Sequence, residues 1–121
     1  MNAKPTLKPV ALSPFESTAV LTAPLKLSQL ADEVLSKAFV NYSFDDWIGT
    51  AKYLTSYLKV FNNNAMGYAM RGYCRYMYNN KEESKLDFAT AKRISSTSYM
   101  VFYFQTLVAI KENKKERAYT L

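Results

Sequence analysis

Two arginines four residues apart are the side chains in this sequence that are best suited to chemistry. Arg71 and Arg75 are separated by about one helical turn, so in a helix they lie on one stripe. Guanidinium groups offer paired donors to carboxylates and phosphates, and the tyrosines beside them could stack on a base. The pair could therefore contact an anion or an acidic partner. The alternative is that both arginines cover aromatic neighbours or pair with an acid of the same chain, such as Asp87.

The rest of the composition excludes most familiar catalytic groups. The chain of 121 residues has no histidine, which removes the commonest general base and the commonest metal ligand. Its single cysteine, Cys74, forms no internal disulfide, zinc cluster or redox pair, and we expect it to be a small core residue. The pairs Asp45-Asp46 and Glu82-Glu83 are expected at turns and helix N-termini. The sequence therefore predicts a protein that is not an enzyme and uses no cofactor or metal.

Charge and aromatic content favour an interaction surface. Sixteen Lys and Arg against ten Asp and Glu give a net charge of +6, which favours acidic partners. Ten Tyr, seven Phe and one Trp bring the aromatic content to 15%, and such side chains provide large contact areas at low entropic cost. A hydrophobic content of 49% is enough for one packed core in a chain of this length.

The distribution of proline divides the chain into two parts. All four prolines lie near the start of the chain: Pro5, Pro9, Pro14 and Pro24. Because proline interrupts helices, we expect residues 1–26 to form an extended arm and residues 27–121 to form a helical domain. The arm has no unbroken apolar run of the length found in signal peptides, and no segment has the roughly 20 apolar residues needed to cross a bilayer. A cytoplasmic protein without a transmembrane segment is expected.

Apolar residues that recur every three or four positions predict a series of helices after residue 27. The predicted helices cover residues 30–39, 47–58, 65–78, 82–94 and 99–111, with turns between them. Residues 99–110 also contain many aromatic and β-branched side chains, which would suit a strand. The internal repeat described next favours a helix over a strand for this segment.

Placing residue 31 over residue 65, and residue 65 over residue 99, aligns three predicted turns with one another. These turns are Asp45-Asp46-Trp47, Asn79-Asn80-Lys81 and Asn113-Lys114-Lys115. We call this shift the repeat interval. Small or hydroxylated residues align at the eighth place of each unit (Ala38, Gly72, Thr106) and at the twentieth (Thr50, Ser84, Ala118). Small residues that recur at this interval where paired helices touch are typical of a stack of helical hairpins.

The middle unit carries a family resemblance. Tyr68 stands at a large aromatic place, Gly72 at a small one, and Phe88 and Ala91 follow in the second helix. With these residues, unit 65–98 resembles a tetratricopeptide (TPR) repeat. A degenerate repeat at residues 31–64 precedes it and a truncated one at residues 99–121 follows. The resemblance implies an all-α fold, a stack of antiparallel helical hairpins known as an α-solenoid.

TPR-like proteins bind partner segments along the surface formed by the first helix of each repeat. The resemblance places seven residues on that surface: Phe39, Tyr42, Met66, Tyr73, Tyr76, Met100 and Tyr103. It therefore implies a non-catalytic protein–protein interaction module, such as a small adaptor, an assembly factor or an accessory subunit. The alternative at each of these positions is that the side chain closes the core of a short stack.

The last predicted helix raises the question of what covers it. Residues 99–110 are apolar on nearly every face, and only a short polar segment follows them. The end of a helical stack normally carries a capping helix with a polar outer face. We expect the last helix to bend back, the arm to cover the open face, or another chain to do so in a homo-oligomer or larger assembly.

The sequence leaves two other functions open. The first alternative is a nucleic-acid binder that uses Arg71, Arg75 and the following lysine-rich helix. The second is docking to a membrane-bound complex.

Overall fold

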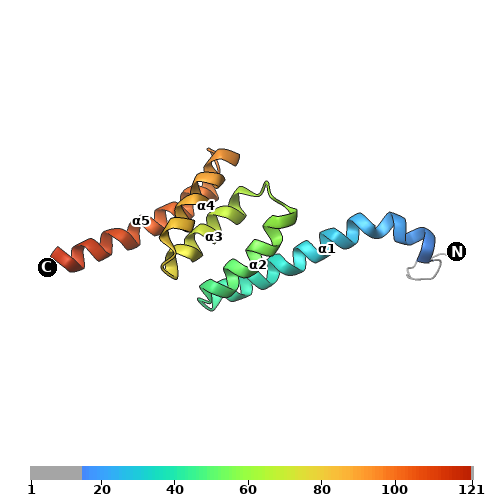
Figure 1. Cartoon of the computed structure of the whole chain (residues 1–121), viewed down its shortest axis with the longest axis horizontal. Coiled ribbons are helices and arrows are strands. Elements are labelled where there is room, and N and C mark those ends of the chain that lie inside the picture. The colour runs from blue at the N-terminus through green and yellow to red at the C-terminus, as the bar shows by residue number, and fades with distance from the viewer. Residues whose placement is uncertain (1–14, 121) are drawn as a thin grey trace. The chain divides into compact units, whose positions relative to one another are not determined.

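The computed structural model describes the backbone of residues 15–120 and the side chains of residues 29–116. Five helices account for this part of the chain (Figure 1). They are α1 (Phe15–Ser43), α2 (Trp47–Val60), α3 (Ala65–Met77), α4 (Lys81–Ile94) and α5 (Tyr99–Thr120). The described residues contain no strand, so the all-α prediction is confirmed and residues 99–110 are helical.

The chain divides into two units, Met1–Glu33 and Val34–Leu121, and α1 contributes residues to both. Residues 15–26, which we expected to be extended, are helical, and this corrects the predicted length of the arm. Residues 15–23 contain neither proline nor glycine. Proline lacks the backbone N–H and its ring crowds the carbonyl of the fourth preceding residue, yet the helix continues through Pro24. The expectation for residues 1–14 lies outside the described residues.

Helix α3 is central to the second unit, because it contacts α2, α4 and α5. In Figure 1 it runs between α2 and α4. The core forms along these contacts from small and aromatic side chains. Its buried members are Ala38, Leu54, Ala69, Met70, Tyr73, Phe88, Ala91, Val101 and Phe104. Four helices and the end of α1 therefore share one hydrophobic core.

The first two predicted turns are built in the same way, one repeat interval apart. Asp45 and Asn79 take positive φ angles of 61° and 71°, which Asn and Asp tolerate better than most residues. The next residues, Asp46 and Asn80, cap α2 and α4, since each side chain accepts a hydrogen bond from the backbone N–H three positions later. Two consecutive Asp or Asn residues therefore end one helix and begin the next.

Contacts within the two hairpins also recur at this spacing. The hydroxyl of Thr50 donates to the carbonyl of Asp46 at 2.8 Å and lies 3.4 Å from that of Ala38, and the hydroxyl of Ser84 donates to that of Gly72 at 2.6 Å. A Cβ atom at Gly72 would lie 3.1 Å from the Cβ of Asp87, so glycine allows α3 and α4 to approach closely. The predicted helix contacts at the eighth and twentieth places are thus present in both hairpins.

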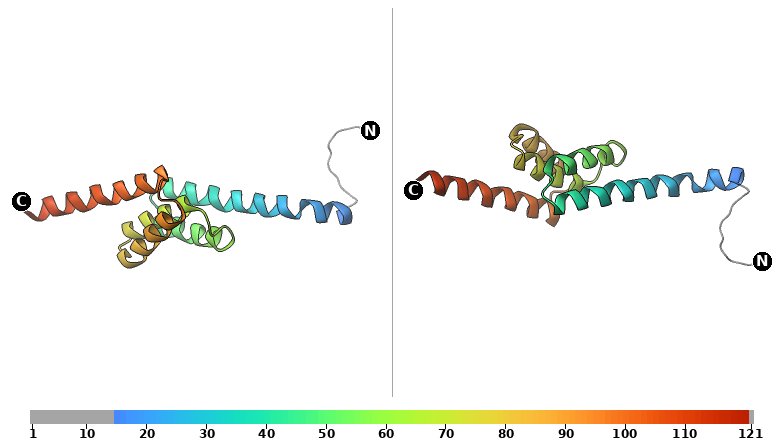
Figure 2. Two further views of the ribbon diagram at one scale, coloured as in Figure 1. Left: turned by 90° about the horizontal axis from the view of Figure 1, so that it is seen from above. Right: turned by 90° about the horizontal axis from the view of Figure 1, so that it is seen from below.

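The third predicted turn, at Asn113-Lys114-Lys115, is absent, which corrects the predicted end of the last helix. Helix α5 continues without interruption from Tyr99 to Thr120 (Figure 2). The position after Asn113 holds Lys114, whose side chain has no acceptor for the N–H groups at a helix start. Because Asn113 is not followed by a capping residue, helix continuation is favoured. No described segment follows α5 as the second helix of a third hairpin.

Candidate partner-binding surface

The arginine pair is neutralised from within the chain. Arg71 donates from Nε and Nη2 to the two carboxylate oxygens of Asp87, at 2.9 and 2.7 Å. Arg75 donates to the same carboxylate at 3.0 Å and lies 3.3 Å from Glu83. The side chain of Asp87 is only 5% exposed. The predicted anion or acidic-partner site at Arg71 and Arg75 is therefore occupied by Asp87, and the two arginines connect α3 to α4.

The environment of Arg71 keeps it charged. Burial acts to lower its pKa, but the hydrogen bonds and the negative charge of Asp87 outweigh burial and raise the pKa above its ordinary value. Its Nη1 also donates to Thr55 at 3.1 Å, and its guanidinium lies 5.5 Å from the centre of the Tyr68 ring. This guanidinium thus has partners in α2, α3 and α4.

The seven residues predicted to bind a partner separate into three groups by exposure. Tyr73 and Tyr76 are buried, Phe39 and Tyr103 are exposed, and Tyr42, Met66 and Met100 are intermediate. The expectation that all seven line one open surface is therefore corrected for the two buried tyrosines, which belong to the core. The two exposed residues remain available to a partner.

Tyr73 lies at the centre of an aromatic cluster. Its ring centre is 5.6 Å from that of Trp47, 5.8 Å from that of Phe104 and 6.2 Å from that of Tyr42. Edge-on and tilted contacts of this kind are favourable beyond the area they bury. Burial, with smaller effects from Tyr73 and other neighbours, raises the pKa of Tyr42 well above its ordinary value. The cluster joins the end of α1 to α2, α3 and α5.

A polar contact fixes the continuation of α5 beside the α3–α4 turn. The Tyr76 hydroxyl donates to the Glu112 carboxylate, and Lys81 lies 3.6 Å from the same oxygen. The ammonium groups of Lys81 and Lys115 also lie 5.7 and 5.6 Å from the centre of the Tyr76 ring. Burial and the bond to Glu112 raise the pKa of Tyr76 to about 12. These contacts favour a helical residue 112, where the sequence predicted a turn.

This contact makes stability depend on pH. The hydrogen bond from Tyr76, followed by the charges of Lys81 and Lys115, lowers the pKa of Glu112 below its ordinary value of 4.5. Because the pKa is lower in the folded state, the stabilisation is complete above the unfolded pKa and is lost as the pH falls through the folded pKa. We expect Glu112→Gln to lose less thermal stability than the wild type as the pH falls from roughly 6 to roughly 3.

Circular dichroism melting curves at several pH values measure this difference. Glu116→Gln removes an exposed carboxylate one helical turn away and serves as the control. It should keep the full acid sensitivity of the wild type. Identical acid sensitivity in the wild type, Glu112→Gln and Glu116→Gln would show that the Tyr76–Glu112 contact does not contribute.

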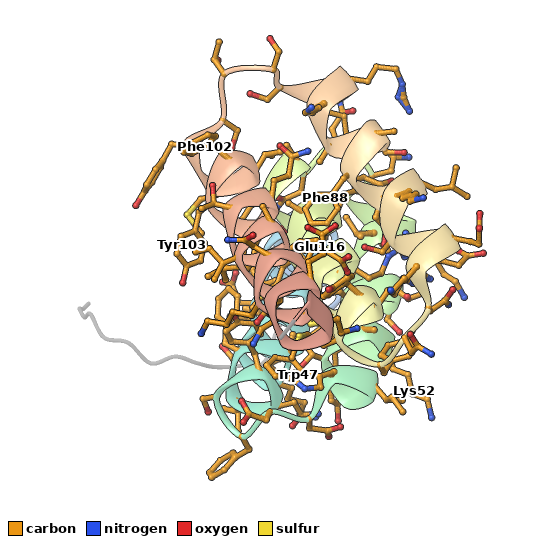
Figure 3. The ribbon with its side chains drawn as sticks, turned by 90° about the vertical axis from the view of Figure 1, so that its left-hand side faces the viewer. Trp47, Lys52, Phe88, Phe102, Tyr103 and Glu116 are labelled. Carbon is orange, nitrogen blue, oxygen red and sulfur yellow. The ribbon has the colours of Figure 1, made fainter. Side chains whose placement is uncertain are left out.

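The outer face of α5 exposes large apolar side chains. Tyr99 is 76% exposed and Phe102 is 70% exposed, and Tyr103 and Ile110 are also exposed. Spacings of three, four, seven and eleven positions place them on one side of the helix. Figure 3 shows Phe102 and Tyr103 projecting from α5 on the side away from the other helices, whereas Phe88 points inward. We call these four residues the α5 stripe.

None of the four positions in α3 that correspond to the α5 stripe is exposed: Ala69 and Tyr76 are buried, and Ala65 and Tyr68 are intermediate. Ala69, one repeat interval before Tyr103, is fully buried, whereas Tyr103 is 45% exposed. Tyr76, which precedes Ile110 by the same interval, is also buried. Tyr99, Phe102 and Ile110 were not among the predicted site residues. A signal was nevertheless present for two of the four, because Ala65 and Ala69 of α3 correspond to Tyr99 and Tyr103 of α5.

A groove lies next to the stripe, between α4 and α5. It has a volume of about 440 Å³ and is lined by Lys85, Phe88, Ala89, Lys92, Gln105, Val108 and Ala109. A second hollow of about 380 Å³ shares Lys85, Phe88 and Val108 with it and extends to Glu112. We call the two together the α4–α5 groove. Its floor is apolar and its α4 edge carries lysines.

The other groups that could react are inert or absent in the described part of the chain. Cys74 is fully buried, and burial with a smaller effect of Asp46 raises its pKa to about 12, so the unreactive thiol dominates. Among the described residues, no group of three metal-binding side chains lies together. The described helices also include none that is long and apolar enough to span a membrane.

Comparisons with known proteins add no further constraint. The chain was compared with protein-family models, with curated proteins and with solved structures, and none of the three comparisons found a match.

Proposed function

We propose that this chain is a non-catalytic protein–protein interaction module that binds a partner segment on the exposed face of α5. The observation that carries the proposal is the α5 stripe, where large aromatic side chains stand exposed at positions that are buried or intermediate in α3. Exposed apolar patches of this kind on a small domain mark interaction sites. A small adaptor, an assembly factor or an accessory subunit of a larger complex fits this architecture.

The energetics favour a protein as the partner. Removing a large apolar side chain from water contributes about 1.5–3 kcal/mol, and the four side chains of the α5 stripe lie on one rigid helix. Such preorganised aromatic residues lose little conformational entropy on binding. A partner that covers this stripe would gain most from Phe102 and Tyr99, the two most exposed aromatic residues on α5.

The repeated geometry supports a TPR-like assignment within this proposal. Turns, caps and hydroxyl-to-carbonyl contacts recur one repeat interval apart in the first two hairpins. Helix α5 then corresponds to the first helix of a third repeat, without a second helix among the described residues. We include a cytoplasmic location in the proposal, since the one cysteine is buried and forms no disulfide within the chain.

Site-specific photo-crosslinking tests the proposal. We place p-benzoylphenylalanine at position 102 in the cells that produce the protein, and at position 52 as the control. Lys52 is exposed on α2 and points away from α5 in Figure 3. Illumination should give one discrete protein adduct at position 102 and none at position 52. Equal labelling at both positions, or adducts at neither, would contradict a binding surface on α5.

A nucleic-acid partner remains the competing function because α4 exposes Lys85, Lys92 and Arg93. Burial of Arg71 and Arg75 against Asp87 removes two of the cations on which that function relied. Phosphate contacts would make binding fall steeply with salt. Binding of labelled RNA or DNA is measured at several salt concentrations. If the chain binds at low salt, and its affinity falls about tenfold or more for each doubling of the salt concentration, this function is favoured over the proposed one.

A further inference from the structure

We propose that the α4–α5 groove binds an acidic amphipathic helix of a protein partner, which lies against α5 as α4 lies against α3. This inference rests on the proposed function and specifies the class of partner. It follows from three properties of the second unit: the internal repeat, the shape of the groove and the charge along its edge.

The repeat supplies the template for the bound helix. On α3, the face that contacts α4 is centred on Gly72, where Asp87 and Phe88 of α4 come closest. The corresponding position on α5 is Thr106, with Gln105 and Ala109 at the positions of the two arginines of α3. No other helix of the second unit packs on this face of α5 as α4 packs on α3. A helix from another molecule can therefore take that place.

The shape of the groove fits a helix. Phe88 and Val108 form the apolar floor, and Ala89 and Ala109 are small residues on either side. Small side chains allow two helix axes to approach closely. Helix α4, which lies in the corresponding place on α3, has 14 residues, so its length is about 21 Å at about 1.5 Å per residue. A partner helix of about four turns spans the groove.

The charge along the groove favours an acidic partner, because the one acidic residue among the described residues that line it, Glu112, lies 3.6 Å from Lys81. Lys85 and Lys92 line it on the α4 side, and neither takes part in a salt bridge among the described residues. The corresponding residues on α2 are the buried Ala51 and Leu58, so these lysines are specific to the α4–α5 groove. Since the two lysines are two helical turns apart, carboxylates seven positions apart on a partner helix can meet both.

The same charges argue against occupants from this protein. Residues 1–14 contain Lys4 and Lys8 and no acidic residue. A second copy of the chain would bring another net charge of +6. Both would meet repulsion at Lys85 and Lys92, whereas an acidic helix would be attracted and oriented. The groove therefore favours a different protein over the N-terminal arm or a homodimer.

Two stapled peptides with the same length as α4 probe the groove. Both carry the same leucine and alanine face, one with glutamates seven positions apart beside that face and the other with lysines at the same places. Fluorescence anisotropy of labelled peptides with the full chain measures their affinities. The glutamate peptide should bind about tenfold more tightly at low salt, since two exposed ion pairs account for a difference of this size. Equal affinity of the two peptides would overturn the inference.

A charge-swap variant makes the test specific to the groove. Lys85→Glu combined with Lys92→Glu should reverse the preference, so that the lysine peptide binds more tightly. Lys52→Glu combined with Lys59→Glu changes the net charge by the same amount at exposed positions on α2 and is the matched control. It should keep the preference for the glutamate peptide. Far-ultraviolet circular dichroism confirms that both variants are folded. Loss of preference in both double variants alike would show that only net charge matters, and would overturn the inference.

The outcomes separate this inference from the proposed function. A protein adduct at position 102 together with indifference to peptide charge retains the interaction module and rejects the acidic helix. If no adduct forms at position 102 and the peptides also bind with equal affinity, both the interaction module and the acidic helix are rejected. Light scattering that shows a dimer, with the α5 stripe protected in it, assigns the surface to a second copy and likewise rejects the acidic helix.

Discussion

Asp87→Ala is expected to lower the free energy of unfolding by about 3–5 kcal/mol, because it leaves the largely buried guanidinium of Arg71 without a counter-charge and that of Arg75 with only the exposed Glu83. Asp87 accepts hydrogen bonds from both Arg71 and Arg75 and is itself buried. A small domain has about 5–15 kcal/mol of total stability, so this loss is a large fraction of it. Urea denaturation followed by circular dichroism measures the change.

Two further variants separate the ion-pair network from the packing around it. Glu83→Ala removes an exposed partner of Arg75 and should cost less than about 1 kcal/mol. A triple variant with Arg71→Leu, Arg75→Met and Asp87→Leu replaces the whole network with apolar side chains of similar size, and should recover most of the stability lost in Asp87→Ala. If Asp87→Ala costs no more than Glu83→Ala, the network does not join α3 to α4 as described.

Tyr73→Ala should have an effect of similar size, for a different physical reason. Tyr73 is 5% exposed and contacts Tyr42, Trp47 and Phe104, so truncation leaves a cavity among four helices. Removing a large buried aromatic side chain costs about 3–5 kcal/mol. The midpoint of urea unfolding, monitored by tryptophan fluorescence, measures the loss because Trp47 lies in the same cluster.

Tyr103→Ala is the matched control for Tyr73→Ala. Both are tyrosines that were predicted to lie on one binding surface, but Tyr103 is 45% exposed. We expect Tyr103→Ala to change stability by about 0.5–1 kcal/mol at most and to reduce crosslinking to a partner. A stable Tyr73→Ala variant that loses its partner would return Tyr73 to the binding surface and would contradict its place in the core.

Much of the fold is encoded by local signals that the sequence displays. The pairs Asp45-Asp46 and Asn79-Asn80 each provide one residue that tolerates positive φ and one that caps the next helix, so both turns were predictable. The small residues Ala38 and Gly72 were also recognisable as helix contacts, since a larger side chain at Gly72 would hold α3 and α4 apart. Such features depend on a few neighbouring residues.

The candidate site depended on long-range contacts that no local pattern specifies. Whether Arg71 met Asp87 or a ligand was decided by the distance between α3 and α4. Whether α5 turned at Asn113 was decided by a missing cap at Lys114 and by the contact of Glu112 with Tyr76. The exposed α5 stripe follows from that continuation, because the helix that would have covered it is not formed by the described residues.

Hydroxyl-radical footprinting tests most directly the claim that α5 exposes an apolar stripe which a partner covers. Oxidation is measured at Tyr99, Phe102 and Tyr103, with Tyr73 as the buried reference, in the purified chain and in the complex isolated from cells. We predict rapid oxidation of the three α5 residues in the free chain, slow oxidation of Tyr73 in both samples, and protection of Phe102 in the complex. Two results would contradict this claim: an oxidation rate of Phe102 as low as that of Tyr73 in the free chain, or the same oxidation rate of Phe102 in the free chain and in the complex.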